Sequence, residues 1–138
     1  MCSAKERGST PFFSSAETAL LYGAAGAAVS VKFGHEREGE FTRQASLVAD
    51  ACERWGLPLM VEAMAKGKEM KSTDPKGILL ASRAAQEIGA DIVKTYYTGD
   101  PDSFHKVVEG CPVPIVILGG EKMNSLQEVC AVVESSLA

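Results

Sequence analysis

The sequence predicts an α/β fold built on a parallel β-sheet, and two observations carry this prediction. Short apolar runs of strand character alternate with amphipathic segments, in an order that begins and ends with a helix. Glycines placed to end helices stand a few residues before each predicted strand: Gly23 or Gly26, Gly56, Gly89 and Gly110. A repeated unit of this kind joins successive strands in parallel through right-handed helical crossovers.

The domain is expected over residues 14–138, after a loose polar segment at residues 1–13. A length of 138 residues fits a single domain. The first helix is expected to begin at Ser14, because Ser14 and Glu17 have the spacing of a capping box, and to stop at Gly23.

Four apolar runs predict the strands, at residues 27–33, 57–64, 90–97 and 112–118. Both faces of these strands are largely apolar, as in a parallel sheet that helices cover on both sides. The remaining helices are expected at residues 36–55, 74–88, 100–109 and 125–137. Two of them begin with an Asp-Pro pair, in which the aspartate caps the helix and the proline takes its first position.

Composition and charge exclude several classes of protein. Hydrophobic residues make up 46% of the chain, which is enough to bury a core and argues against disorder. No apolar run is long enough to span a bilayer, so no membrane partner is expected. The net charge of −4 and the isoelectric point of about 5.2 disfavour a nucleic-acid partner, which would need a basic face.

Cysteine and histidine usage indicates a cytoplasmic protein without a metal. The charged start of the chain is not followed by an apolar stretch, so it lacks the form of a secretory signal. The four cysteines, Cys2, Cys52, Cys111 and Cys130, form no C-x-x-C pair. With only two histidines, a multi-histidine metal site is excluded within one chain. Reduced thiols in the cytoplasm are therefore expected.

Three charged residues, Lys32, Glu62 and Lys94, interrupt the predicted strands toward their carboxyl ends. A charge inside a sheet is costly unless it is paired. Lys32 and Glu62 are open to two interpretations, a functional position or an edge side chain that reaches water. Lys94 lies among apolar and aromatic neighbours and is the stronger functional candidate. An amine removed from water loses proton affinity, and a neutral amine can add to a carbonyl and form an imine.

Two loops that follow predicted strands are candidates for holding an anion. Gly119 and Gly120 offer open backbone amides to a phosphate after the last strand, although a plain glycine turn also explains them. Before the helix at residues 100–109, a capped helix start is the better interpretation, because the Asp100 carboxylate would repel an anion.

Two segments of the sequence resemble one enzyme family. They are IGADIVKTYYTGDP at residues 88–101 and CPVPIVILGG at residues 111–120. Together, at this spacing, they resemble the archaeal-type class I fructose-bisphosphate aldolase family, which includes sugar-phosphate aldolase, transaldolase-like synthase and thiolase relatives. Weaker similarity extends from about Ala16 to Glu121.

The resemblance implies a (β/α)₈ TIM barrel, of which this chain would hold about strands four to seven. A complete barrel takes about 250 residues. The chain shows no counterpart to the family's first strand, with its catalytic aspartate, or to its eighth strand, with its glycine–arginine phosphate segment. A partial barrel leaves open strand edges, so a homo-oligomer or a complementing chain is expected.

The resemblance also assigns roles to residues. Lys94 falls on the Schiff-base lysine of the sixth strand, and Gly119 and Gly120 fall on the phosphate-binding end of the seventh. Family substrates are ketose phosphates or related phosphorylated carbonyl compounds, bound without a metal, and no cofactor is expected. The family's aldolases carry a proton-shuttling tyrosine where Met64 stands here. Glu62, two residues earlier on the same side of the strand, is expected to take over proton transfer.

Three functions follow from this resemblance and its departures. The first is a class I aldolase that acts through an imine at Lys94. The second is a thiolase-like relative, since these relatives also lack the tyrosine. The third is a non-catalytic half-barrel that serves as an assembly or binding module.

Overall fold

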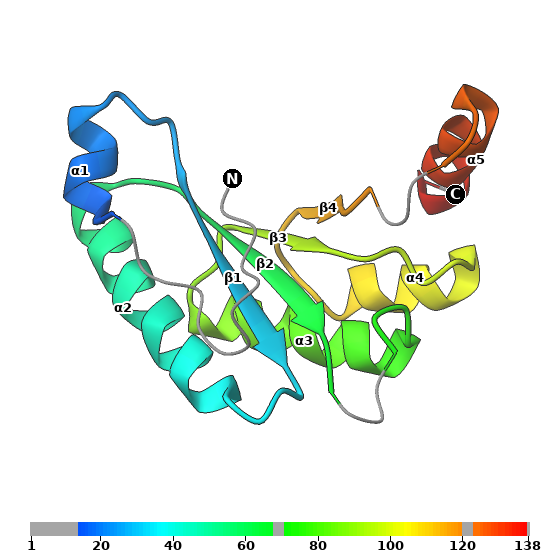
Figure 1. The fold of residues 1–138 in the computed structure, drawn as a ribbon, viewed down its shortest axis with the longest axis horizontal. Coiled ribbons are helices and arrows are strands. Elements are labelled where there is room, and N and C mark those ends of the chain that lie inside the picture. Colours follow the sequence, from blue (N-terminus) through cyan, green and yellow to red (C-terminus); the bar gives the residue numbers. More distant parts are fainter. Residues whose placement is uncertain (1–13, 68–70, 120–122, 138) are drawn as a thin grey trace.

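The computed structural model describes residues 14–67, 71–119 and 123–137 as a four-stranded parallel sheet with five helices (Figure 1). The elements are α1 (Ala16–Leu21), β1 (Ala27–Phe33), α2 (Glu38–Trp55), β2 (Leu59–Ala65), α3 (Pro75–Ile88), β3 (Ile92–Thr95), α4 (Pro101–Glu109), β4 (Ile115–Ile117) and α5 (Leu126–Leu137). The strands pair in parallel in the order β1-β2-β3-β4. The predicted α/β class, element order and parallel sheet are confirmed.

The helix boundaries follow from local caps. Asp74 accepts a hydrogen bond from the Gly77 amide at 2.7 Å, and Asp100 accepts one from the Ser103 amide at 2.9 Å. Gly56 ends α2 with φ at 63°, a left-handed conformation that glycine adopts without steric cost. Both predicted Asp-Pro helix starts are therefore confirmed, and so is the predicted end of the second helix.

The start of α1 differs from the prediction by one residue. Ser15, rather than Ser14, caps the helix, and its hydroxyl accepts a hydrogen bond from the Thr18 amide at 3.2 Å. With Ser15 as the cap, Glu17 is the second helical residue rather than the third, so it does not complete a capping box, and its Oε1 accepts a hydrogen bond from Trp55 Nε1 at 2.9 Å. A contact with α2 thus holds the carboxylate that the local spacing assigned to the cap.

The last strand is shorter than its apolar run predicted. β4 pairs only over Ile115–Ile117, whereas the run covers residues 112–118. Pro112 and Pro114 have no amide hydrogen, so neither can donate to the ladder. The Pro114 carbonyl still accepts a hydrogen bond from the Val93 amide at 2.9 Å, which fixes the start of the strand against β3.

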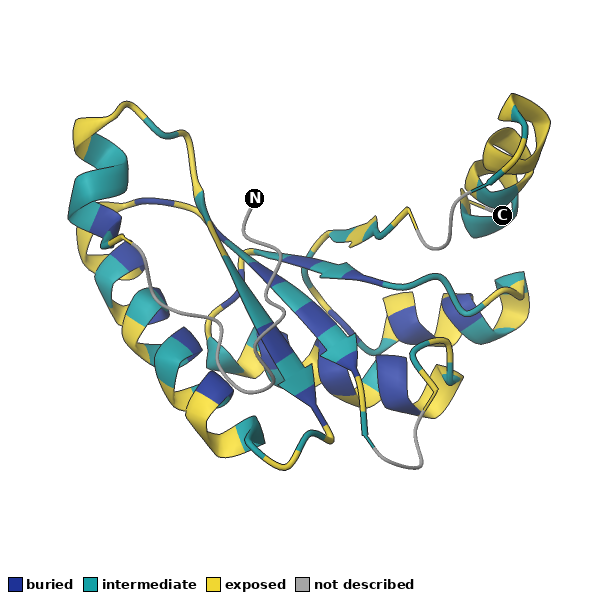
Figure 2. Ribbon diagram, in the orientation of Figure 1, coloured by how far each residue is buried: buried dark blue, intermediate teal, exposed yellow. Residues whose placement is uncertain are grey.

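The described helices cover one face of the sheet, which corrects the expectation that both strand faces are covered. Along β2 the buried residues alternate with half-exposed ones, and Figure 2 shows the same alternation in colour. The buried set on the strands includes Val31, Val61 and Val93, and it faces α2 and α3, whose buried residues include Ile78 of α3. The opposite, open face carries Ser30, Glu62 and Lys94, whose polar groups remain within reach of water.

The outermost elements of the described sheet leave apolar surface exposed. β1 and β4 each have one strand neighbour, and Val116 of β4 is exposed. α5 has the predicted apolar side chains, yet none of its described residues is buried. Figure 1 shows this helix set apart from the sheet, beyond the end of β4. The Tyr97 hydroxyl, 2.6 Å from the Ser135 hydroxyl, ties it to the rest of the fold.

The described cysteines are free thiols, of which Cys52 and Cys111 are buried and Cys130 is exposed. Burial raises the pKa of the Cys52 thiol above its usual value of 9.0. Cys2 and residues 1–13 as a whole lie outside the described part of the chain.

Among the described helices, none has the length and apolar character needed to cross a bilayer.

Candidate active site

A lysine and a glutamate meet on the open face of the sheet. Glu62 lies at the middle of β2, and Lys94 lies opposite it on β3. Lys94 Nζ is 3.3 Å from Glu62 Oε1, so the two side chains form an ion pair across neighbouring strands. The pairing explains how the sheet accommodates both charges, because each one is offset by the other.

Ser30 extends this pair to a third strand. It lies opposite Glu62 on β1, and its hydroxyl donates a hydrogen bond to Glu62 Oε2 at 2.5 Å. The two carboxylate oxygens therefore have different partners, the hydroxyl on one side and the ammonium on the other. Parallel register places Ser30, Glu62 and Lys94 in one row that crosses β1, β2 and β3.

The amine of Lys94 is not enclosed by apolar side chains, contrary to the expectation from its strand neighbours. The Lys94 side chain is 32% exposed, and Glu62 is 25% exposed. The physical reason is the strand register, which places a carboxylate from residue 62 beside an amine from residue 94. Both groups are therefore partly accessible from the open face.

The other predicted charge, Lys32, does not join this pair. It lies on β1, two strands from Lys94, as expected. Its Nζ sits over the ring of Phe41, 5.5 Å from the ring centroid, in a cation–π contact. Met64 is opposite Lys32 in the register and shares the open face with Glu62. The predicted placement of Glu62 and Met64 on one side of the strand is confirmed.

Gly119 follows β4 at the carboxyl edge of the sheet. The amide of Leu118 still donates to the Thr95 carbonyl at 2.6 Å, so the chain leaves the sheet at Gly119. Gly119 is exposed, and a Cβ added there would meet no atom within 4 Å. The position is thus open to a ligand from outside. Gly120, the second glycine of the predicted anion site, lies outside the described residues.

Sequence reasoning missed one polar member of the row and one structural threonine. Ser30 was not singled out, although residues 30, 62 and 94 are separated by the same 32 positions. That spacing is the separation between register partners on β1, β2 and β3, and it could have indicated the alignment of these residues. Thr95, beside the lysine, faces the helix-covered side instead. It is fully buried, and its hydroxyl donates to the Ala63 carbonyl at 2.9 Å.

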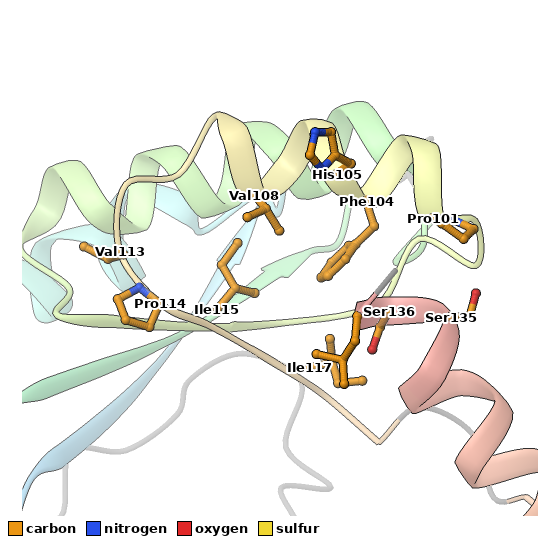
Figure 3. Close-up of a pocket in the computed structure, with 11 residues that line it drawn as sticks. Pro101, Phe104, His105, Val108, Val113, Pro114, Ile115, Ile117, Ser135 and Ser136 are labelled. Atoms are coloured by element: carbon orange, nitrogen blue, oxygen red, sulfur yellow. The ribbon is translucent and has the colours of Figure 1, made fainter.

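A separate groove lies on the helix-covered side of β4 (Figure 3). Its volume is about 390 Å³, and apolar side chains from α4 and β4 line most of it, among them Phe104, Val108, Ile115 and Ile117. In Figure 3, α5 brings Ser135 and Ser136 to one end of the groove. Neither Glu62 nor Lys94 borders the groove, so it is distinct from the row on the open face.

The row has the chemistry of amine catalysis. A lysine amine can add to a carbonyl, and a carboxylate at 3.3 Å can accept or return a proton. Within residues 14–67, 71–119 and 123–137, no cluster of three His, Cys, Asp or Glu side chains could hold a metal ion.

Comparison with known proteins finds a family model and curated relatives that match this chain. A model of the DeoC/LacD aldolase family matches residues 3–137. A 2-amino-4,5-dihydroxy-6-oxo-7-(phosphonooxy)heptanoate synthase of Streptomyces griseus is 33% identical over 90% of this chain and 46% of its own length. A 3-hydroxy-5-phosphonooxypentane-2,4-dione thiolase of Enterobacter sp. (strain 638) is 40% identical over 83% of this chain and 38% of its own length.

Solved structures agree with this result. The structure of a Schiff-base-forming fructose-1,6-bisphosphate aldolase is 31% identical, has a TM-score of 0.86, and aligns over 90% of this chain and 50% of its own length. In an archaeal fructose-1,6-bisphosphate aldolase, the catalytic lysine is covalently bound to the carbinolamine intermediate of the substrate. That structure is 30% identical, with a TM-score of 0.85, over 89% of this chain and 50% of its own length.

The chain spans about half the length of these solved structures and somewhat less of the curated relatives. Its four parallel strands thus correspond to part of a barrel.

Proposed function

Because the chain belongs to the DeoC/LacD family of aldolases, we propose that it acts as a class I aldolase through an imine at Lys94. The proposed substrate is a phosphorylated ketose or a related phosphorylated carbonyl compound. The observation that carries the proposal is the Lys94–Glu62 pair, which places an amine and a proton acceptor 3.3 Å apart on an open face of the sheet.

Imine formation starts with proton transfer between the two side chains. The ammonium of Lys94 gives a proton to Glu62 Oε1, and the neutral amine attacks the ketone carbon of the substrate. The resulting carbinolamine takes up a proton and loses water, which leaves an iminium ion. Lysine suits this step because, unlike arginine, it can reach the neutral form that adds to a carbonyl.

The iminium then acts as an electron sink. When a base removes the proton from the hydroxyl on the β carbon, that oxygen forms the carbonyl of an aldehyde, the bond between the α and β carbons breaks, and its electron pair moves into the iminium, forming an enamine. An aldehyde leaves, the enamine carbon takes up a proton, and water hydrolyses the restored iminium. Glu62 is the proposed carrier of these protons, since Met64 cannot supply the family's tyrosine hydroxyl.

The proposed substrate class rests on the relatives and on Gly119. The names of the synthase and the thiolase both contain a phosphonooxy group. Gly119 stands at the carboxyl edge of the sheet with open space around it. We assign the amides of Gly119 and Gly120 to the phosphate. Backbone N–H groups at a strand end can bind an anion, and glycine has no side chain that would keep the phosphate away from them.

Borohydride trapping tests the proposed function. The protein is incubated with dihydroxyacetone phosphate and borohydride, and its intact mass is measured. The parent is expected to gain the mass of one reduced adduct, whereas Lys94→Met gains none and keeps its fold. Lys32→Met is the matched control, because Lys32 lies two strands away, and it should react like the parent. An adduct on Lys94→Met, or none on the parent, contradicts the proposal.

A thiolase-like activity is the second candidate, because a thiolase relative is 40% identical to this chain and Met64 replaces the tyrosine here. The two candidates differ in the fate of the carbon unit. An aldolase releases an aldehyde, whereas a thiolase transfers an acyl group to a thiol. Product analysis with 3-hydroxy-5-phosphonooxypentane-2,4-dione and coenzyme A separates them, since only the thiolase forms an acyl thioester.

Self-association forms part of the proposal. β1 and β4 are outer strands of the described sheet, and exposed Val116 marks unpaired apolar surface on β4. A second copy or a complementing chain would cover these edges. Light scattering at micromolar concentration is expected to show an oligomer, and a well-folded monomer contradicts self-association. If the parent forms an oligomer but no adduct, the non-catalytic assembly module becomes the better interpretation.

A further inference from the structure

Ser30 holds one oxygen of the Glu62 carboxylate. Its hydroxyl donates a hydrogen bond to Oε2 at 2.5 Å, while Oε1 lies 3.3 Å from Lys94 Nζ. A hydroxyl bonded to a carboxylate forms a charge-assisted hydrogen bond, which is stronger and shorter than a neutral one. The contact is built into the sheet, because Ser30 and Glu62 are register partners on neighbouring strands.

The Ser30 hydroxyl matters for the orientation of Glu62, because a half-buried side chain is less restricted by packing than a fully buried one. It is half-buried on an open face, and Met60 and Met64, its nearest strand neighbours on that face, offer no hydrogen-bond donor. A glutamate has several rotatable bonds, so without a second contact it can turn away from Lys94 at little cost. The Ser30 hydroxyl restricts this freedom by holding the oxygen farther from the amine.

We propose that Ser30 is a positioning residue that keeps Glu62 Oε1 directed at the Lys94 amine. The inference rests on the proposed imine chemistry. With Oε2 held by the Ser30 hydroxyl, Oε1 is the oxygen that takes the proton from the Lys94 ammonium. Ser30 keeps its own proton throughout, and it neither touches the carbonyl nor forms a covalent bond.

The consequence is an effect on rate rather than on folding. Ser30 is half-exposed on the outermost strand β1, so its side chain can change without disturbing the core. Loss of one hydrogen bond to a charged group is expected to slow adduct formation by about tenfold.

Two substitutions of matched shape test the role of the hydroxyl. Threonine keeps the hydroxyl and valine replaces it with a methyl group, and both residues suit a β-strand. The rate of reduced-adduct formation is measured with dihydroxyacetone phosphate and borohydride on the parent, Ser30→Thr and Ser30→Val. We expect Ser30→Val to react about tenfold more slowly and Ser30→Thr to stay close to the parent. Urea unfolding of all three proteins checks that they are equally folded.

A double-mutant cycle shows whether Ser30 acts through Glu62. In a Glu62→Ala background, Ser30→Val is expected to cause no further loss of rate, because there is no carboxylate left to position. A purely structural effect of valine would persist in that background. If Glu62→Ala forms no adduct, the comparison of threonine with valine decides the matter alone.

The outcomes separate this inference from the proposed function. If the parent forms the adduct and Ser30→Val is as fast, or Ser30→Thr is as slow as Ser30→Val, the positioning role is wrong and the imine proposal stands. If the parent forms no adduct, the imine proposal is wrong and the role of Ser30 is overturned with it.

Discussion

Glu62 and Lys94 lie opposite each other on neighbouring parallel strands, with the carboxylate Oε1 3.3 Å from the ammonium Nζ. Helices cover the other face of the sheet, so the pair faces an open side that a ligand can reach. An ion pair that is partly exposed adds little to stability, because water screens it and two long side chains lose freedom. Changes at either residue are therefore expected to show in the chemistry before they show in folding.

Replacement of Glu62 tests its proposed role in proton transfer. Glu62→Gln keeps the shape and still accepts a hydrogen bond from Ser30, but it cannot take a proton from Lys94. Adduct formation with dihydroxyacetone phosphate is expected to slow by about a hundredfold. The free energy of unfolding should change by less than about 1 kcal/mol. Exposed Glu36→Gln is the control, and a Glu62→Gln protein that reacts at the parental rate would remove the residue from the mechanism.

A bulky side chain at Gly120 tests the proposed phosphate site. Gly120→Val is expected to block close approach of a phosphate to the backbone amides after β4. Binding of dihydroxyacetone phosphate, measured by titration calorimetry, should weaken by about tenfold, the effect of roughly one lost hydrogen bond. Gly39→Ala, on the exposed start of α2, should bind like the parent. Equal affinity of Gly120→Val and the parent would rule out the site.

Alanine substitutions at two glycines, Gly89 and Gly39, are expected to change the free energy of unfolding in opposite directions. Gly89 ends α3 with φ at 115°, and a Cβ there would lie 3.2 Å from the Ala49 side chain. Gly89→Ala should destabilise the fold by about 1–2 kcal/mol, because alanine is strained at positive φ and is crowded here. Gly39 is the second residue of α2, and a Cβ there meets no atom within 4 Å. Gly39→Ala should stabilise by about 0.5–1 kcal/mol. Urea unfolding measures both, and similar values for the two variants would contradict the structural distinction.

The contact between Glu17 and Trp55 predicts an acid-dependent stability. The indole donates to the carboxylate at 2.9 Å, and this hydrogen bond is the main reason that the pKa of Glu17 lies below its usual value of 4.5. A carboxyl group with a lowered folded pKa stabilises the fold above its unfolded pKa. That contribution is lost as the pH falls through the folded value.

The measurement compares the parent with Trp55→Phe at several pH values. The difference in their free energy of unfolding is expected to shrink as the pH is lowered below 4.5. The same comparison in a Glu17→Gln background should show no such change, since that side chain does not titrate. A parent-to-variant difference that stays constant on acidification would show that the contact does not affect stability.

The sequence alone determined the elements and singled out Lys94 as the candidate reactive residue. The caps at Asp74 and Asp100 and the helix end at Gly56 depend on atoms within a few residues, so local patterns predict them. Lys94 stood out because a charge in an apolar strand needs an explanation. The cap at Ser15 shows the limit of this reasoning, since a distant tryptophan holds the glutamate that the local pattern assigned to the cap.

Only the tertiary structure decided what surrounds Lys94. Its contact with Glu62, and the bond from Glu62 to Ser30, join residues that are far apart in the chain and depend on the register of three strands. That register is set by how the helices pack on the opposite face, because a one-residue slip would turn every side chain to the other side. The same packing covers one face of the sheet, leaves the other open, and so exposes Lys94 to a ligand.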